Sequence, residues 1–498
     1  MRHAPNPRVL PALTLLPALT LLLAPAAAPG QEPTVDEARR AIETALTPSI
    51  QVAGEPVPAY SLEERMADHG VPGVSVAVVH VGRIHWAAAY GMADVEEGRP
   101  VTTETLFQAA SISKPVAALA ALQLVEEGRL ELDADVNRYL ESWKVPPSDA
   151  AGGEPVTIRR LVTHSAGLTV HGFRGYARGE PVPSTVEVLD GSGPANSAPV
   201  RVDIRPGERH RYSGGGYTVL QLLLADVLGR PFPDLMRERV LDPVGMTAST
   251  YRQPLPEALR DRAATGYRAG GSEVVGKWHT YPEMAAAGLW TTPSDLARYV
   301  LEVQRAVRGE SDVLGPEMAA AMVTPGVGGW GLGPGLDGEG DARRFSHGGA
   351  NEGFRAVFFG SVSGGEGAAV MTNSDTGGAL YTEIVRALAR VYGWSGWEAR
   401  VIDEVALGPD GADAFAGTYE VQGMDLVVRV EAVGSRLRLQ VPGRPAAELV
   451  HVGDDAFVDV ADGTRLRFER NDAGEVEAIR QGNLRAVRSE GATPPRPW

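Results

Sequence analysis

Ser111 and Lys114 stand three positions apart at the start of an Ala-rich stretch, in the order Ser-Ile-Ser-Lys-Pro. On a helix such a pair lies on one face, so the hydroxyl and the amine can meet. Pro115 is tolerated only in the first turn of a helix, which predicts a helix with Ser111 at its N-terminus. The positive end of the helix dipole there favours an alkoxide and disfavours a protonated ammonium. The pattern indicates a serine nucleophile served by a lysine base.

A lysine base must be neutral near pH 7, which requires its pKa to fall by about three units, or roughly 4 kcal/mol. Arginine cannot do this. The chain has only three lysines, Lys114, Lys144 and Lys277, among its 47 basic residues, so a lysine at this spacing is informative. The same spacing also arises by chance, as a helix cap followed by a surface lysine, so the pair needs companions.

Two further motifs follow in order, Tyr212-Ser213-Gly214 and, much later, His347-Gly348-Gly349-Ala350. With them the chain resembles the serine β-lactamase and penicillin-binding-protein superfamily, and it looks most like the branch of class C β-lactamases, D-aminopeptidases and related esterases. The resemblance covers roughly residues 60–392. It includes further phrases, among them residues 161–168 and 287–296.

The resemblance implies a role for each of these residues. Ser111 would be the nucleophile that forms an acyl-enzyme. Lys114 and Tyr212 would share its proton, with Tyr212 as the base and then as the acid that protonates the leaving group. The backbone amides of Ser111 and Ala350 would form the oxyanion hole.

Two departures from the β-lactamase pattern bear on the substrate. The Lys-Thr-Gly motif, whose cation and hydroxyl hold a carboxylate, is replaced by His347-Gly348-Gly349, and Gly214 stands where an Asn amide would contact the substrate. His347 is expected to line the site, and the two glycines to let their strand approach the substrate closely. We therefore expect hydrolysis of small esters or short (D-)peptides, the alternative being a β-lactamase or a penicillin-binding sensor that acylates once and turns over poorly.

The elements that must position these residues form an α+β arrangement. Strands are predicted at residues 74–80 and 83–90, joined as a hairpin through Val81-Gly82, and again at 355–360 and 368–373, with many helical stretches between them. This order predicts a β-lactamase-like antiparallel sheet with an inserted helical region. The loop-rich stretch 169–211 either borders the site or is a solvent-exposed insertion.

The predicted division of the chain starts with a signal peptide at residues 1–30 and a helical lead-in at 31–59. The β-lactamase-like catalytic domain follows at 60–400, then a linker at 401–411. Residues 412–490 carry short alternating runs separated by turn signals, which predict a small all-β barrel. This last region resembles the lipocalin-like barrels appended to some members of the superfamily, through Phe415-Ala416-Gly417-Thr418-Tyr419.

The N-terminus is typical of an export signal. Arg2 and Arg8 precede an apolar run at residues 9–23, and small residues lead up to Gly30, after which we expect cleavage. Fifteen residues are too few for a stable membrane span, so a periplasmic or secreted protein is predicted, with an uncleaved anchor as the alternative.

Composition excludes several kinds of function. The net charge of −16 lacks the positive footprint of a nucleic-acid-binding protein, and the absence of Cys rules out disulfides, thiol catalysis and iron–sulfur clusters. No cofactor and no metal are implied. His80 and His85 lie on the predicted hairpin at an odd spacing, which predicts that they point to opposite faces and do not share a metal ion. The substrate would be a small molecule, and the sequence does not indicate an oligomeric state.

Overall fold

The computed structural model describes residues 32–489 except 409–410, 425, 443–445, 462 and 483. The predicted signal peptide therefore lies outside the described residues. Within these ranges, no helix combines the length and the apolar composition that crossing a membrane requires.

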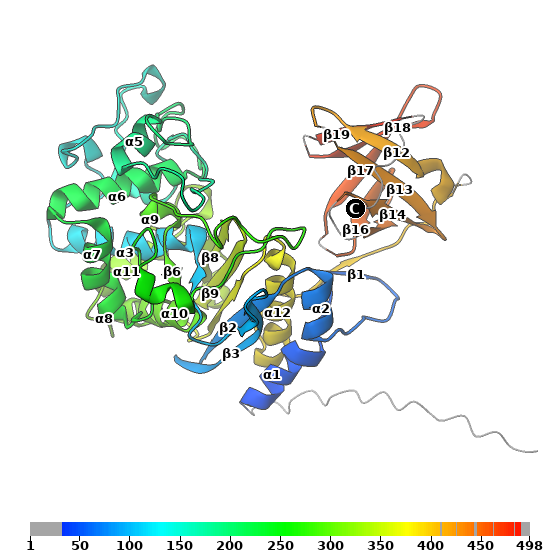
Figure 1. Cartoon of the computed structure of the whole chain (residues 1–498), viewed down its shortest axis with the longest axis horizontal. Helices are drawn as coiled ribbons and strands as arrows, with labels where there is room; N and C mark the ends of the chain where they lie inside the picture. Colours follow the sequence, from blue (N-terminus) through cyan, green and yellow to red (C-terminus); the bar gives the residue numbers. More distant parts are fainter. Residues whose placement is uncertain are drawn as a thin grey trace, which may run out of the picture.

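An antiparallel sheet of seven strands forms the centre of the predicted catalytic domain, in the order β4-β3-β2-β10-β9-β8-β7 (Figure 1). All eight residues of β2 are buried, and its Val-rich sequence suits a strand covered on both faces. The predicted hairpin is β2 and β3, and the predicted late strands are β9 and β10. The strands are β2 (Gly73–His80), β3 (Arg83–Asp94), β4 (Arg99–Pro100), β7 (Gly335–Asp337), β8 (Arg344–Asn351), β9 (Phe354–Ser361) and β10 (Gly367–Thr372).

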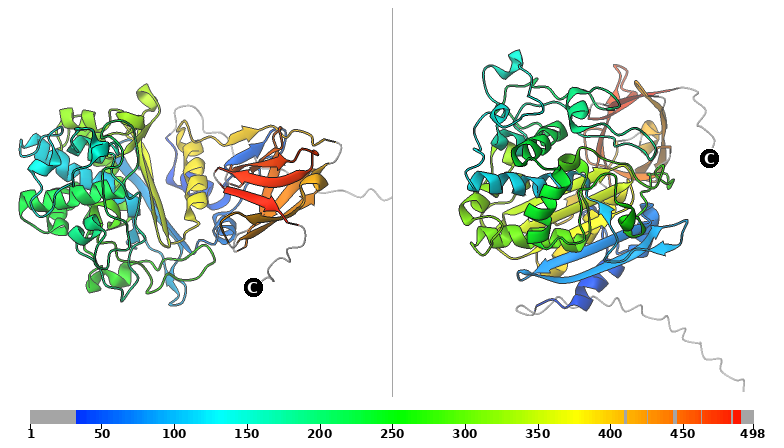
Figure 2. Two further views of the ribbon diagram at one scale, coloured as in Figure 1. Left: turned by 90° about the horizontal axis from the view of Figure 1, so that it is seen from above. Right: turned by 60° about the vertical axis from the view of Figure 1, so that its left-hand side comes forward.

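The sheet separates two hydrophobic cores, because side chains alternate between its faces. Val74, Val76 and Val78 pack with helices α1, α2 and α12, whereas Ala77 and Val79 pack with α10 and the inserted helical region. Figures 1 and 2 show this three-layer arrangement. The first group is α1 (Val35–Thr44), α2 (Leu62–Asp68) and α12 (Gly377–Tyr392); the second includes α3 (Ser113–Glu126), α4 (Ile158–Val162), α5 (Thr185–Asp190), α6 (Gly214–Leu228), α7 (Phe232–Met236), α8 (Asp242–Val244), α9 (Met284–Ala287), α10 (Pro293–Val307) and α11 (Pro316–Met322). The predicted α+β fold is confirmed.

Helix α3 lies at the centre of the inserted helical region. Every residue from Ser113 to Leu124 is buried, which matches a helix that is apolar on all sides. A single 3-10 turn, η1 (Ala110–Ile112), precedes it, so Ser111 lies just ahead of the α-helix. A helix held on every side is a rigid base for the residues at its start.

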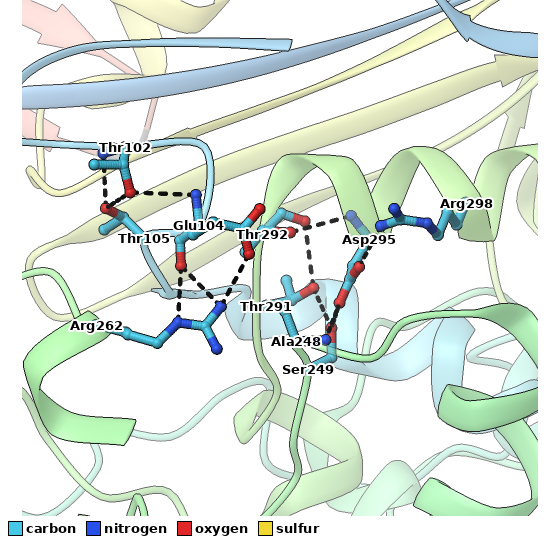
Figure 3. A network of polar contacts seen from close by, with 10 residues as sticks. All are labelled: Thr102, Glu104, Thr105, Ala248, Ser249, Arg262, Thr291, Thr292, Asp295 and Arg298. Atoms are coloured by element: carbon cyan, nitrogen blue, oxygen red, sulfur yellow. Dashed lines mark hydrogen bonds and ion pairs between the residues drawn. The ribbon is translucent and has the colours of Figure 1, made fainter. Parts of the chain in front are cut away.

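The start of α10 is fixed by a polar network that also holds the neighbouring strand β6 (Trp290–Thr291) (Figure 3). The Thr292 side chain accepts a hydrogen bond from the backbone N–H of Asp295 and caps the helix. The buried carboxylate of Asp295 accepts hydrogen bonds from Ala248 N (3.0 Å) and Ser249 Oγ (2.7 Å) and pairs with Arg298 (2.6 Å). Strand β6 pairs with β5 (Phe107–Gln108), which leads into η1, so this network supports the turn that carries Ser111.

The C-terminal region forms a closed barrel of eight strands, as predicted from its alternating pattern. Its interior is filled by Phe415, Tyr419, Phe457 and Phe468, whose rings lie 5.0–6.0 Å apart in edge-to-face contacts. The strands are β12 (Gly417–Val421), β13 (Val427–Val433), β14 (Arg436–Gln440), β15 (Ala447–His451), β16 (Ala456–Asp459), β17 (Arg465–Arg470), β18 (Val476–Gln481) and β19 (Leu484–Arg488).

The barrel is attached near the start of the chain. Strand β1 (Ile50–Val52), within the predicted lead-in, pairs in parallel with β11 (Arg400–Ile402), so the first residues of the predicted linker form a strand. Ile50 and Ile402 pack against Val450 and Val458 of the barrel. In Figure 1 and in the left view of Figure 2, the barrel lies beyond α12, on the side of the sheet away from α3 and α6.

The expectation that His80 and His85 lie on opposite faces is wrong. Their rings are 5.5 Å apart, because a β-bulge lets Val79 pair with Ile84 directly after Val78 pairs with Trp86, leaving His85 without a partner in the register. His80 Nδ1 lies 2.9 Å from Glu366, and His85 Nδ1 lies 2.8 Å from the Tyr392 hydroxyl. Among the described residues, no group of three or more His, Asp or Glu side chains is arranged to hold a metal ion.

Candidate active site

The Ser111–Lys114 pair meets at the start of α3. Lys114 Nζ lies 3.0 Å from Ser111 Oγ and 2.8 Å from the carbonyl oxygen of Ala286 in α9. The lysine is 2% exposed, and this burial lowers its pKa to about 7. This is the fall that a lysine base requires. A neutral amine can donate to Ala286 and still accept the proton of Ser111 with its lone pair.

The backbone immediately before Ser111 is strained. Ala110 has φ +50°, a left-handed conformation that costs a residue with a Cβ about 1–3 kcal/mol. Ser113 Oγ donates to the Ala110 carbonyl (2.6 Å) and accepts from Leu289 N (2.9 Å), which holds the turn in place. The strain therefore sits at the residue directly before Ser111.

Tyr212 stands directly before α6 and faces the pair. Its ring centroid lies 4.9 Å from Lys114 Nζ, and its phenol interacts with Ser111. Burial raises the pKa of Tyr212, so the phenol keeps its proton at neutral pH. The structure thus brings together the three predicted catalytic residues, with the lysine as the group that more readily gives up its proton.

His164 fixes the segment that carries Tyr212. Its ring stacks on the tyrosine with centroids 4.1 Å apart, and its Nδ1 accepts a hydrogen bond from Ser213 N (3.1 Å). Its carbonyl accepts a hydrogen bond from Arg211 N (2.7 Å). The sequence-based interpretation of His164 as a structural residue bonded to loop backbone agrees with these contacts.

Three aromatic residues of this site were not identified from the sequence. Trp330 contacts Tyr212 edge-on at 5.9 Å and stacks on His210 at 5.1 Å, and His171 contacts Tyr212 at 4.9 Å. The available signal was Trp330 itself, a large aromatic residue set among glycines between two helical regions. His171 comes from the loop-rich stretch 169–211, part of which therefore borders the site.

Strand β8 supplies the second wall of the site. A Cβ on Gly349 would lie 2.1 Å from the carbonyl oxygen of Ala109, so only glycine fits where this strand passes η1. Gly348 is exposed and has no such neighbour. The close approach of Gly349 thus serves the protein's own backbone. Ala350, the next residue, is exposed just beyond the contact with η1.

The outer edge of β8 is open at this point. Strand β7 pairs only with residues 344–346, so among the described residues no strand covers β8 from His347 onward. Ala350 pairs with Arg355 of β9 on the inner side. An open edge next to Ser111 can bind a substrate by backbone hydrogen bonds.

His347 is a neutral imidazole in this structure. Its Nδ1 lies 2.6 Å from the carbonyl oxygen of Gly348, which can only accept, so Nδ1 carries the proton. Burial and the nearby Lys114 lower its pKa to about 3. Its buried Nε2 is then an acceptor with no partner among the described residues. The ring can orient a donor but supplies no cation.

Gly214 opens helix α6 beneath the loop. It is buried, its N–H donates to the His171 carbonyl (3.0 Å), and a Cβ there would lie 2.9 Å from the Phe173 ring. The position predicted to face the substrate is thus covered by His171 and Phe173.

A family model described as Beta-lactamase matches residues 61–391. The chain belongs to the beta-lactamase family. This confirms the resemblance carried by the three motifs.

Beta-lactamase-family relatives cover different parts of the chain. Esterase EstB of Burkholderia gladioli is 33% identical over 223 residues, covering 43% of this chain and 54% of the esterase. Penicillin-binding protein 4 of Amycolatopsis lactamdurans is 28% identical over 374 residues, covering 72% and 95%. The chain spans 54–63% of the length of the first curated relatives it matches.

A solved structure supports the beta-lactamase-family fold. The octameric penicillin-binding protein homologue from Pyrococcus abyssi superposes with a TM-score of 0.57 and 23% identity, covering 86% of this chain and 98% of that chain. At this level of identity the likeness shows the fold alone.

Proposed function

We propose that the chain is a serine hydrolase that cleaves small esters through an acyl-enzyme on Ser111, with short (D-)peptides as the second substrate class. The observation that carries the proposal is the buried Lys114 amine, with a pKa of about 7, 3.0 Å from the Ser111 hydroxyl. The likeness to an esterase at 33% identity supports the same chemistry.

The geometry supports the following steps. Ser111 Oγ attacks the ester carbonyl carbon and its proton passes to Lys114 Nζ, while backbone amides near Ser111 and Ala350 stabilise the oxyanion. The bond from the carbonyl carbon to the leaving oxygen then breaks, and that oxygen takes a proton from Tyr212, which is replenished from Lys114. Water attacks the acyl carbon and gives a proton to Lys114; the bond from the acyl carbon to Ser111 Oγ then breaks, Oγ takes that proton back from Lys114, and the acid is released. Because the phenol holds its proton more tightly, Lys114 is the resting base and Tyr212 the acid, which reverses the order expected for the tyrosine.

The neutral His347 supports esters over β-lactams as substrates. A β-lactam carries a carboxylate that the Lys-Thr-Gly motif binds with its cation, and an imidazole with a pKa of about 3 offers no charge there. The covered position of Gly214 likewise leaves no amide to contact an acylamido group.

Steady-state hydrolysis of 4-nitrophenyl acetate and butyrate, nitrocefin and a D-alanyl anilide, beside Ser111→Ala, tests the proposal. Ester turnover that disappears in Ser111→Ala and in Lys114→Arg supports it. Absence of turnover on every substrate, with a fluorophosphonate probe still labelling Ser111, would overturn it in favour of a sensor that acylates once. Dominant nitrocefin turnover would overturn the substrate class.

We further propose export, on the strength of Arg2, Arg8 and the apolar run at residues 9–23. N-terminal sequencing of the protein recovered from expressing cells tests this. A chain that begins at Gln31 supports export with cleavage after Gly30, and an intact Met1 contradicts the cleavage.

A further inference from the structure

A polar cavity of about 410 Å³ is lined by loops that are continuous with elements of the candidate site. Its lining comes from the loop-rich stretch 169–211, from residues near 268–279 and from the turn after β8. The residues that matter here are Arg174, Tyr176, Glu180, Arg268, His279 and Glu352. The volume suits a short acyl chain or an amino-acid-sized group.

Two contacts tie this cavity to the elements that hold the reacting carbonyl. Gln108 stands three residues before Ser111, and its amide donates to the His279 carbonyl (2.7 Å) and accepts from Asn351 (2.8 Å). Glu352 stands two residues beyond Ala350, a distance of about 7 Å along an extended strand. These contacts place the wall of the cavity next to β5 and the end of β8, the two elements that lead to Ser111 and Ala350.

The opposite wall also starts at the catalytic residues. His171, whose ring contacts Tyr212, is followed three residues later by Arg174. The backbone carbonyl of Arg174 accepts a hydrogen bond from His279 Nδ1 (2.9 Å), so the main chain of this arginine is anchored to the far wall.

The charged side chains of the cavity differ in whether they already have an ion-pair or hydrogen-bond partner. Arg268 pairs with Glu352 at 2.9 Å, so these two charges offset each other. Glu180 accepts the N–H of Ala177 (2.8 Å) and closes its own turn. Arg174 forms no ion pair within the described part of the chain, although its backbone is fixed. Its guanidinium is thus the positive charge of the cavity that is available to a ligand.

We propose that this cavity binds the acyl part of the substrate and that Arg174 pairs with a carboxylate at the end of that acyl chain. The inference rests on the proposed ester hydrolysis and adds a substrate class to it, esters of dicarboxylic acids. A guanidinium matches a carboxylate with two parallel N–H donors. Selectivity for a carboxylate, which position 347 does not supply, would then arise at Arg174.

The test compares three 4-nitrophenyl esters with one leaving group: hexanoate, the monoester of hexanedioic acid, and 6-aminohexanoate. We expect Arg174→Gln to lower kcat/KM for the hexanedioic monoester by about tenfold or more, mainly through KM, and to leave hexanoate close to wild-type. Arg178→Gln removes the same charge from the same stretch outside the cavity lining and is the matched control. It should change none of the three.

The outcomes separate the inference from the proposed function. Hexanoate turnover that depends on Ser111, combined with equal losses on all three esters in Arg174→Gln, overturns the inference alone. Preference for the 6-aminohexanoate ester, lost in Glu180→Gln, also overturns it, because the cavity would then select an ammonium group. Absence of Ser111-dependent turnover on all three esters overturns the proposed function itself.

Discussion

A Cβ on Gly349 would lie 2.1 Å from the carbonyl oxygen of Ala109, so strand β8 and the turn that carries Ser111 are packed backbone against backbone. No side chain can enter this contact without moving one of the two segments. Because Gly349 has no Cβ, Ser111 and the open edge of β8 can lie this close to each other. This makes Gly349 a positioning residue.

Gly349→Ala should push β8 away from η1 and misplace the oxyanion donors. We expect kcat for ester hydrolysis to fall by at least about tenfold, since removal of one oxyanion donor costs 10²–10³, and the melting temperature to fall as well. Gly348→Ala is the matched control for stability, because its Cβ would meet nothing closer than 3.9 Å. Wild-type kcat in Gly349→Ala would contradict the positioning role.

The pH dependence of kcat/KM should report the ionisation of Lys114. Since burial lowers its pKa to about 7, activity rises with pH as the amine loses its proton, with a midpoint near 7. The pKa of His347 is about 3, so His347→Gln should leave that midpoint in place even if it changes the rate. A profile that is flat from pH 6 to 8 would exclude Lys114 as the base.

The same burial should make Lys114 costly for folding. Its pKa is lower in the folded state than in the unfolded chain, so the unfolded state binds more protons between about pH 7 and the ordinary lysine value of 10.5. The cost is complete below pH 7 and fades as the pH rises toward 10.5. Urea unfolding should find Lys114→Met inactive but more stable than wild type, with a larger gap at pH 6 than at pH 9.5. A gap that does not vary with pH would contradict the lowered pKa.

Asp295→Asn should destabilise the start of α10. The amide NH2 would replace one carboxylate oxygen and face a group that itself donates, either Ala248 N or Arg298, in a site that is 1% exposed. A loss of about 1–3 kcal/mol in the free energy of unfolding is expected. Glu104→Gln breaks the exposed pair with Arg262 in the same region (Figure 3) and should cost little. Equal losses in the two variants would show that burial does not matter here.

Local patterns were enough to predict much of this fold. The β2–β3 hairpin, the late strands β9 and β10 and the alternating barrel strands all follow from periodicity and turn residues, and the structure contains them. The bulge that brings His85 beside His80 was not predictable, because it depends on register between two strands. Periodicity describes one segment at a time.

The residues of the candidate site also divide into those that the sequence predicted and those that only the structure showed. Ser111, Lys114 and Tyr212 were identified by residue type, spacing and order. Trp330 and Arg174 were not, because their place depends on how distant loops fold over α6 and β8. The reversed proton affinities of Lys114 and Tyr212 likewise follow from burial, which a motif does not encode.

The barrel has a consequence for how such chains arise. Its interior is occupied by its own aromatic rings. Among the described residues, its attachment includes the β1–β11 pair, a small apolar cluster, Arg436, which pairs with Glu55 and Glu404, and hydrogen bonds between His451 and Val405. The family match spans residues 61–391, and the residues that make these contacts lie outside it. In evolutionary terms we therefore expect the barrel to be an exchangeable module. A gene fusion that appends the barrel needs to create only a small set of contacts. Recombination can then replace the barrel without altering the residues around Ser111.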